Sequence, residues 1–162
     1  MTIVSSTQDP EALTFTIVAE LAAPPSRVWQ LWADPRQLER WWGPPTWPAT
    51  FEQHDVVVGG GSRYYMTGPE GEKARGWWRF VSLDEPRSIE FDDGFSDESG
   101  LPNAEMPTIR GRVELEQTAA GTRMTVTSHF ATAEQMQQLV EMGMVEGMNE
   151  AMGQIDKVLA AA

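Results

Sequence analysis

The chain has 162 residues, enough for one domain with a substantial core, and 41% of its residues are hydrophobic. It contains no cysteine, which excludes disulfides, thiol nucleophiles and thiolate metal sites. Its formal net charge of −12 argues against binding to nucleic acid or to an anionic membrane surface, since both are negatively charged. No apolar run is long enough to predict a membrane span, and residues 1–12 lack the features of a signal peptide. We therefore expect a soluble, cytoplasmic protein.

The first predicted elements are a strand and a short helix. Residues 13–21 are rich in β-branched side chains and partly alternate in polarity, which predicts a strand. The proline pair at 24–25 favours a helix start, where a missing N–H costs no hydrogen bond. The Asp-Pro pair at 34–35 predicts the end of this helix.

A second short helix is predicted to contain two adjacent tryptophans. It carries Leu38, Trp41 and Trp42 and ends at Gly43. Successive residues on a helix are about 100° apart, so we expect only one tryptophan to face the core. The spacing from Leu38 favours Trp41, which would then form one wall of a pocket.

The middle of the chain changes to a period of two, which predicts strands. Glycine- and proline-rich turns separate these strands, and no helical segment lies between them. Six successive strands of this kind predict an antiparallel meander, with one long loop at 93–107. The predicted strands are residues 49–58, 62–67, 75–83, 88–92, 108–117 and 123–130.

The last predicted element is a long helix over residues 133–160. Thr132 and Gln135 form a capping box at its start. A helix of this length would extend about 40 Å, enough to cross a whole sheet. The sequence therefore predicts one α+β domain, residues 1–162 with a core of about 13–160, in which a curved antiparallel sheet surrounds a C-terminal helix.

Bulky apolar residues on the strands and on this helix are candidates for a ligand-binding interior. On the last strand, Val126 and Phe130 are expected to point inward together with Met124 and Ser128, because strand parity is fixed at two. Phe95, in the long loop, is expected to fold over the mouth of the pocket. The candidate ligand-binding residues are Trp41, Met66, Trp78, Phe80, Phe91, Phe95, Val126, Phe130, Val140, Gly143, Met144 and Gly147.

Gly143 and Gly147 lie on the apolar stripe of the predicted long helix, where each costs about 1 kcal/mol relative to alanine. Two interpretations remain open. The glycines allow close packing of the helix on the sheet, or they leave room for a ligand beside the adaptable side chains of Met144 and Met148.

No catalytic or metal-binding motif is present in the sequence. His54 and His129 lie on different predicted strands without a metal-ligand spacing, and we expect His129 to be solvated. No nucleophile–base pair is recognisable. The acidic segment 92–98 lacks the spacing of an EF-hand, so a solvated loop is favoured over a calcium site. We expect no cofactor and no metal, and assign no catalytic residue.

Short motifs spread from Thr14 to Leu159 resemble those of a known family. They are Ala23-Pro24-Pro25-Ser26-Arg27-Val28-Trp29, Asp34-Pro35, Trp41-Trp42-Gly43-Pro44, Gly59-Gly60, Gly68-Pro69-Glu70-Gly71, Asp93-Gly94-Phe95, Gly121-Thr122-Arg123-Met124-Thr125 and Met142-Gly143-Met144. Together they are similar to the START-like, or SRPBCC, superfamily, and best match the branch of homologues of the activator of the 90-kilodalton heat-shock protein ATPase. The resemblance implies a helix-grip fold like that of the major birch pollen allergen, with a cavity between sheet and C-terminal helix.

The resemblance implies three possible functions, because the superfamily shares a cavity and not a reaction. The leading hypothesis is binding of an apolar small molecule, such as a lipid, an aromatic or a polyketide-like compound. Alternatives are a polyketide cyclase-like enzyme and a chaperone-associated interaction domain. Polar side chains converging in the cavity would favour the enzyme, and an apolar patch outside it the interaction domain. We expect an apolar ligand as partner, no nucleic acid and no membrane; a homodimer is possible.

Overall fold

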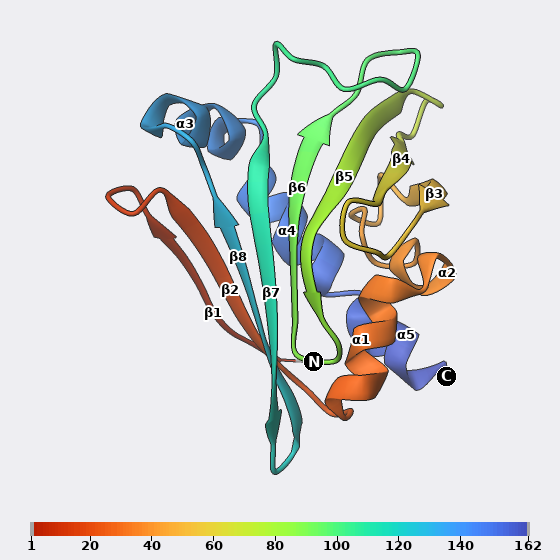
Figure 1. Ribbon diagram of the computed structural model, residues 1–162, viewed down its shortest axis with the longest axis vertical. Coiled ribbons are helices and arrows are strands. Elements are labelled where there is room, and N and C mark those ends of the chain that lie inside the picture. The colour runs from red at the N-terminus through yellow and green to blue at the C-terminus, as the bar shows by residue number, and fades with distance from the viewer. Residues whose placement is uncertain (1, 162) are drawn as a thin grey trace.

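The computed structural model describes residues 2–161, which form one antiparallel eight-stranded sheet and five helical segments (Figure 1). The strand order is β1-β2-β8-β7-β6-β5-β4-β3, so β3 to β8 form the predicted meander. Met1 and Ala162, the ends of the predicted domain, lie outside the described residues. The strands are β1 Thr2–Asp9, β2 Thr14–Leu21, β3 Ala49–His54, β4 Gly61–Thr67, β5 Lys73–Asp84, β6 Ser88–Phe95, β7 Ile109–Thr118 and β8 Gly121–His129. The helices are α1 Pro25–Ala33, α2 Pro35–Leu38, α3 Ala133–Glu141, α4 Met144–Met152 and α5 Ile155–Ala160.

One face of the sheet is buried, and the alternation of buried and exposed residues along each central strand identifies that face. In β2 every second residue is buried, and β8 repeats this pattern with Met124, Val126 and Ser128 facing inward. His129 is exposed. The predicted parity of this strand is therefore confirmed, and so is the α+β helix-grip fold.

Strand β1 was not predicted. It pairs with β2 at the edge of the sheet, with a register shift between Ile3 and Ser5. Its residues beyond Ile3 are exposed, so it carries none of the buried alternating side chains by which strands are recognised. Backbone pairing with the neighbouring edge defines this strand, and the sheet begins well before residue 13.

The two tryptophans after α2 correct one prediction. Trp41 is fully buried, as predicted, but Trp42 is buried as well, with 6% of its surface exposed. The rule of one inward side chain fails because α2 ends at Leu38, and residues 39–43 form a turn. Trp41 donates its indole N–H to the carbonyl of Leu31 at 3.0 Å, while Trp42 packs edge-on against Trp78.

The predicted C-terminal helix is present but interrupted twice. Gly143 adopts a left-handed conformation, with φ of 92°, between α3 and α4, and the turn at Gly153 separates α4 from α5. Left-handed φ values are accessible to glycine without steric cost, which explains the first break. Three short segments therefore replace one straight helix. In Figure 1, α4 passes behind β6, while α3 lies at the upper left and α5 lies at the lower right beside α1.

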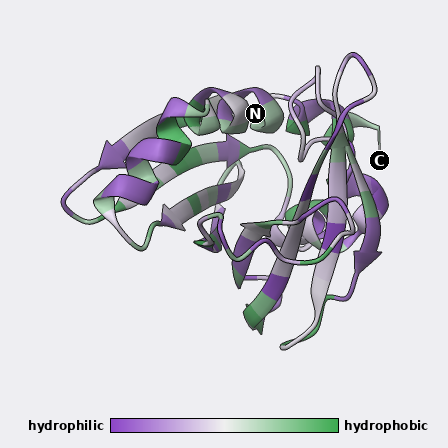
Figure 2. Cartoon of the chain, turned by 90° about the horizontal axis from the view of Figure 1, so that it is seen from above, coloured by the Kyte–Doolittle hydropathy of each residue, from purple (hydrophilic) through white to green (hydrophobic). Residues whose placement is uncertain are grey.

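Polar contacts fasten the C-terminal segments to the rest of the fold. The side-chain amide of Gln154 donates to the carbonyl of Gly43 at 2.7 Å, and Arg27 donates to the carbonyl of Val158 at 3.2 Å. Figure 2 shows the sheet bending around these helices, with hydrophobic and hydrophilic bands alternating along the chain. No helix within residues 2–161 is long and apolar enough to cross a membrane.

Candidate ligand-binding site

An apolar pocket of about 290 Å³ lies between the concave face of the sheet and the junction of α3 with α4. Its volume is just below the range of about 300–1,000 Å³ that is usual for small-molecule sites. Strands β4, β6 and β7 form one side, the turn after α2 forms one end, and α3 and α4 form the other side. We call this the apolar pocket; it is lined by Trp42, Pro44, Tyr64, Met66, Asp93, Phe95, Ile109, Leu139, Met142, Gly143, Met144, Gly147 and Met148.

Five of the predicted ligand-binding residues line this pocket: Met66, Phe95, Gly143, Met144 and Gly147. A Cβ atom added at Gly147 would meet no heavy atom within 4 Å, so this glycine does not mark close packing against the sheet. A Cβ at Gly143 also has free space, but its positive φ would strain any other residue. Of the two interpretations of Gly147, room beside the helix agrees with the geometry.

The other predicted residues lie outside the lining of the apolar pocket. Trp41, Trp78, Phe80 and Phe91 belong to the buried core beneath it, where Trp78 lies 4.4 Å from Phe91, centroid to centroid. Aromatic rings that pack edge-to-face fill space densely, so this part of the interior is core. Val126 and Phe130 are buried in the same core, and Val140 packs against it.

Tyr64 and Asp93 form a polar pair in the wall of the apolar pocket. The Tyr64 hydroxyl donates to Oδ1 of Asp93 at 3.2 Å. Both residues occupy inward positions on their strands, β4 and β6, which are separated in the sheet by β5. Gly76 on β5 lies under the Tyr64 ring, and a Cβ there would lie 2.5 Å from the Tyr64 hydroxyl. The glycine thus allows the tyrosine to reach across β5.

Burial controls the protonation of this pair. It raises the pKa of Asp93 to about 7, and the hydroxyl of Tyr64 and the indole N–H of Trp78 only partly oppose this shift. Burial also raises the pKa of Tyr64 well above 10, and the negative charge of Asp93 adds to that effect. Within residues 2–161 the Trp78 indole N–H makes no hydrogen bond of good geometry, so its influence is that of a nearby dipole. Asp93 therefore changes charge near neutral pH, while Tyr64 remains a neutral donor.

Sequence reasoning missed Trp42, Tyr64 and Asp93. The predicted strand ended at residue 92, which placed Asp93 in a loop, whereas β6 continues to Phe95. The signal was available in the parity of the strands. Residues two apart on a strand share a face, so Asp93 faces inward with Phe91, and Tyr64 faces inward with Met66.

His54, which is half-buried, forms a second polar cluster. Its Nε2 lies 2.8 Å from the carbonyl oxygen of Trp32, and its Nδ1 lies 2.6 Å from the Ser62 hydroxyl. A carbonyl can only accept, so Nε2 carries the proton and the hydroxyl of Ser62 donates to Nδ1. Burial lowers the pKa of His54. Ser62 is 3% exposed, and neither residue lines the apolar pocket, so this cluster joins the end of α1 to β3 and β4.

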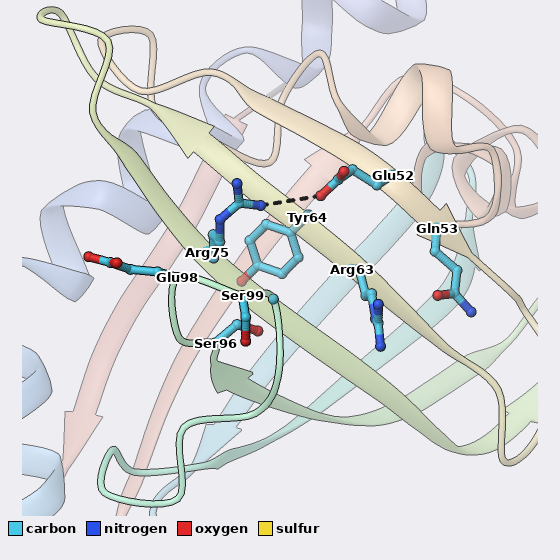
Figure 3. Close-up of a pocket in the computed structure, with 10 residues that line it drawn as sticks. Glu52, Gln53, Arg63, Tyr64, Arg75, Ser96, Glu98 and Ser99 are labelled. Carbon is cyan, nitrogen blue, oxygen red and sulfur yellow. Dashed lines mark hydrogen bonds and ion pairs between the residues drawn. The ribbon is translucent and has the colours of Figure 1, made fainter.

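A rim pocket of about 400 Å³ lies beside β3 to β5 and the segment 96–100 (Figure 3). It is lined by Glu52, Gln53, Arg63, Tyr64, Arg75, Gly76, Ser96, Glu98, Ser99 and Gly100. Figure 3 shows Arg75 joined to Glu52, at 3.4 Å. This pocket is polar, and its acidic and basic side chains balance in charge. Tyr64 contributes to both pockets.

Metal ligands do not gather in the described part of the chain: no group of three His, Cys, Asp or Glu side chains within residues 2–161 could hold a metal ion. In the acidic segment considered for calcium, Asp97 instead accepts hydrogen bonds from Ser99 and from the backbone of Leu101. Its carboxylate therefore orders its own loop.

Comparison with known proteins identifies the family of the chain and shows similar solved structures. Residues 22–160 match the sequence profile of the family described as Activator of Hsp90 ATPase homolog 1-like protein. A solution structure from Arthrobacter aurescens is 58% identical, with a TM-score of 0.94, and the match covers 99% of this chain and 94% of that one. A crystal structure of the Mycobacterium smegmatis protein Ms6760 is 45% identical, with a TM-score of 0.90 and 99% coverage of both chains. No curated protein matches the chain.

Proposed function

Because the chain belongs to the family of Activator of Hsp90 ATPase homolog 1-like proteins, in the SRPBCC superfamily, we propose that it binds an apolar small molecule in the apolar pocket. The observation that carries this proposal is the composition of that pocket. Eleven of its thirteen lining residues are apolar or glycine, and Tyr64 and Asp93 are the exceptions. A concave apolar surface with a few convergent polar groups is the usual form of a small-molecule site.

The α4 side of the pocket is suited to ligands of varied shape. Met144 and Met148 flank Gly147, and unbranched thioether side chains adapt to irregular surfaces. The free space around Gly147 would allow part of a ligand to lie against the backbone of α4. A pocket of about 290 Å³ accommodates a two-ring aromatic or a short aliphatic chain better than a whole phospholipid.

Binding of the neutral fluorescent probe N-phenyl-1-naphthylamine tests this function. We expect saturable binding that Gly147→Leu abolishes, because the added side chain occupies the pocket. Glu150→Leu is the matched control, since it adds the same side chain at an exposed position on the same helix. Equal binding by both variants would place the probe elsewhere and contradict the proposal.

A polyketide cyclase-like enzyme is the second candidate, favoured by the convergence of Tyr64 and Asp93 in the apolar pocket. An intramolecular aldol closure forms one carbon–carbon bond and moves a proton from an α-carbon to a carbonyl oxygen. A carboxyl group that titrates near pH 7 is suited to exchange such a proton. Conversion of a linear polyketone by the wild type, but not by Asp93→Asn, would support this candidate.

A chaperone-associated role would require an apolar patch outside the pocket. The large exposed apolar residues within residues 2–161 come from separate segments and form no single element face. They are Val4, Val57, Val58, Val81, Leu101 and Met142. This role therefore ranks below the other two.

A further inference from the structure

The charge inside the apolar pocket restricts the chemistry of its ligand. Asp93 on β6 and Tyr64 on β4 are the two titratable groups of its lining. Strand β7 contributes Ile109, and α3 and α4 contribute leucine, methionine and glycine. No lysine, arginine or histidine lines the pocket, so a carboxylate ligand would meet a carboxyl group and no compensating cation.

Asp93 itself has no cationic partner within residues 2–161. Its neighbour Asp92, which faces the opposite side of the sheet, is paired with Arg110 at 2.6 Å. A half-buried carboxylate in an apolar wall, such as that of Asp93, is stabilised by a partner that supplies both a positive charge and a hydrogen-bond donor. Asp93 has only the 3.2 Å hydrogen bond from Tyr64, so it retains capacity for a cationic partner.

The dipoles of the adjoining helices do not alter this preference. The C-terminal end of α3 and the N-terminal end of α4 meet at the pocket, at Met142 and Met144. The partial charges at these ends have opposite sign and oppose each other. The net charge of −12 also raises the local concentration of cations and lowers that of anions around the protein.

We propose that the apolar pocket selects an apolar amine, whose ammonium group pairs with the carboxylate of Asp93 while its hydrocarbon part packs against the methionines of α4. This inference rests on the proposed function, because it specifies the ligand of the same pocket. Tyr64 positions the carboxylate by donating to Oδ1 and leaves Oδ2 to the ligand. The same carboxylate should disfavour fatty acids and other apolar carboxylates, which would meet it without a compensating cation.

Three probes that share one ring system test the proposal: 2-naphthylmethylamine, 2-naphthylmethanol and 2-naphthoic acid, titrated by calorimetry at pH 8. We expect the amine to bind about tenfold more tightly than the alcohol, the scale of one charge-assisted hydrogen bond. The acid should bind most weakly. Between pH 5.5 and pH 8 the affinity for the amine should rise as Asp93 ionises, while that for the alcohol stays constant.

Asp93→Asn should remove the preference for the amine over the alcohol, measured as the ratio of the two affinities in the same variant. Asp92→Asn is the matched control, since it removes the same charge from the adjacent residue on the outer face and should keep the preference. If the alcohol binds but the amine has no advantage, or keeps it in Asp93→Asn, the inference fails and the proposed function stands. If none of the three probes binds, both fail.

Discussion

The hydroxyl of Tyr64 and the carboxylate of Asp93 meet at 3.2 Å although a whole strand, β5, separates their strands in the sheet. The contact depends on Gly76, whose missing side chain leaves the space that the tyrosine ring crosses. A Cβ there would lie 2.5 Å from both Cζ and the hydroxyl oxygen of Tyr64. The absence of a side chain at Gly76, on β5, thus allows the hydrogen bond between Tyr64 and Asp93 to form.

Gly76→Ala should displace the Tyr64 ring and destabilise the protein by roughly 1–3 kcal/mol, the usual cost of overpacking. Urea unfolding measures this change. The same substitution in a Tyr64→Leu background should cost less, because the smaller side chain leaves space for the new methyl group. Equal costs in both backgrounds would show that Gly76 does not act through Tyr64.

Asp93 should make stability fall as the pH rises. Its pKa of about 7 in the folded protein exceeds the ordinary value of 3.8, so the folded state holds the proton more tightly than the unfolded state. The stability from this group is present at low pH and is lost as the pH rises through about 7. The unfolding free energy of Asp93→Asn, minus that of the wild type, should therefore increase as the pH rises from 5 to 8.5. We expect an increase of roughly 1–2 kcal/mol, after allowance for water at the pocket wall. Urea unfolding at several pH values measures this difference, and a difference that does not change with pH would contradict the raised pKa of Asp93.

His54 should make the stability of the fold decrease as the pH falls, which is opposite to the effect of Asp93. Its pKa lies below the ordinary 6.5, so the unfolded state binds the proton more tightly and stability is lost as the pH falls below 6.5. In His54→Gln the decline of the melting temperature between pH 7 and pH 5 should be shallower. Ser62→Ala keeps the imidazole and should retain the steep decline, while losing about 1 kcal/mol at pH 7 with its hydrogen bond.

The two helix breaks offer a matched pair of glycines. Gly143→Ala should cost about 1–2 kcal/mol, because its φ of 92° is unfavourable for a residue with a Cβ. Gly153, with φ of −60°, already has a right-handed conformation, so Gly153→Ala should be neutral or slightly stabilising. Similar thermal stability of the two variants would show that the left-handed turn is not required.

Gly147→Ala should leave the apolar pocket open and stabilise α4 by about 1 kcal/mol, since alanine has the higher helix propensity. Its Cβ would meet no neighbouring atom within 4 Å. A melting temperature below that of the wild type would contradict the free space at this position. Comparison with Gly147→Leu then separates the effect on the helix from the effect of filling the pocket.

Much of the fold could be predicted because alternation and turn residues report burial directly. The strands from β2 to β8 follow this pattern, and the family suggested by the sequence motifs is confirmed. The edge strand β1 lacks that signal, because its side chains are exposed and its pairing uses only the backbone. The breaks at Gly143 and Gly153 could not be predicted from the apolar periodicity, because the apolar stripe continues across them.

The candidate site could be predicted only in part, because large apolar side chains indicate an interior without dividing core from pocket. Phe91 and Phe95 lie on the same face of β6, yet Phe91 is core and Phe95 lines the apolar pocket. The boundary between packed core and open pocket depends on where α3 and α4 lie. The polarity pattern of the strands does not predict the position of these helices. Asp93 was missed for a different reason: the strand predicted to end at residue 92 continues to Phe95, so Asp93 lies on the inward face and not in a loop.

The interruption of the C-terminal segment divides it into parts with different constraints. Ile155 and Val158 of α5 are buried and anchor the chain, so few other residues fit there. The apolar pocket is lined by five residues around the Gly143 turn and along α4, each only partly buried or exposed: Met142, Gly143, Met144, Gly147 and Met148. A relative with the same anchor can therefore acquire a pocket of another size or polarity by substitutions around the Gly143 turn, and specificity can diverge within the family while the scaffold is preserved.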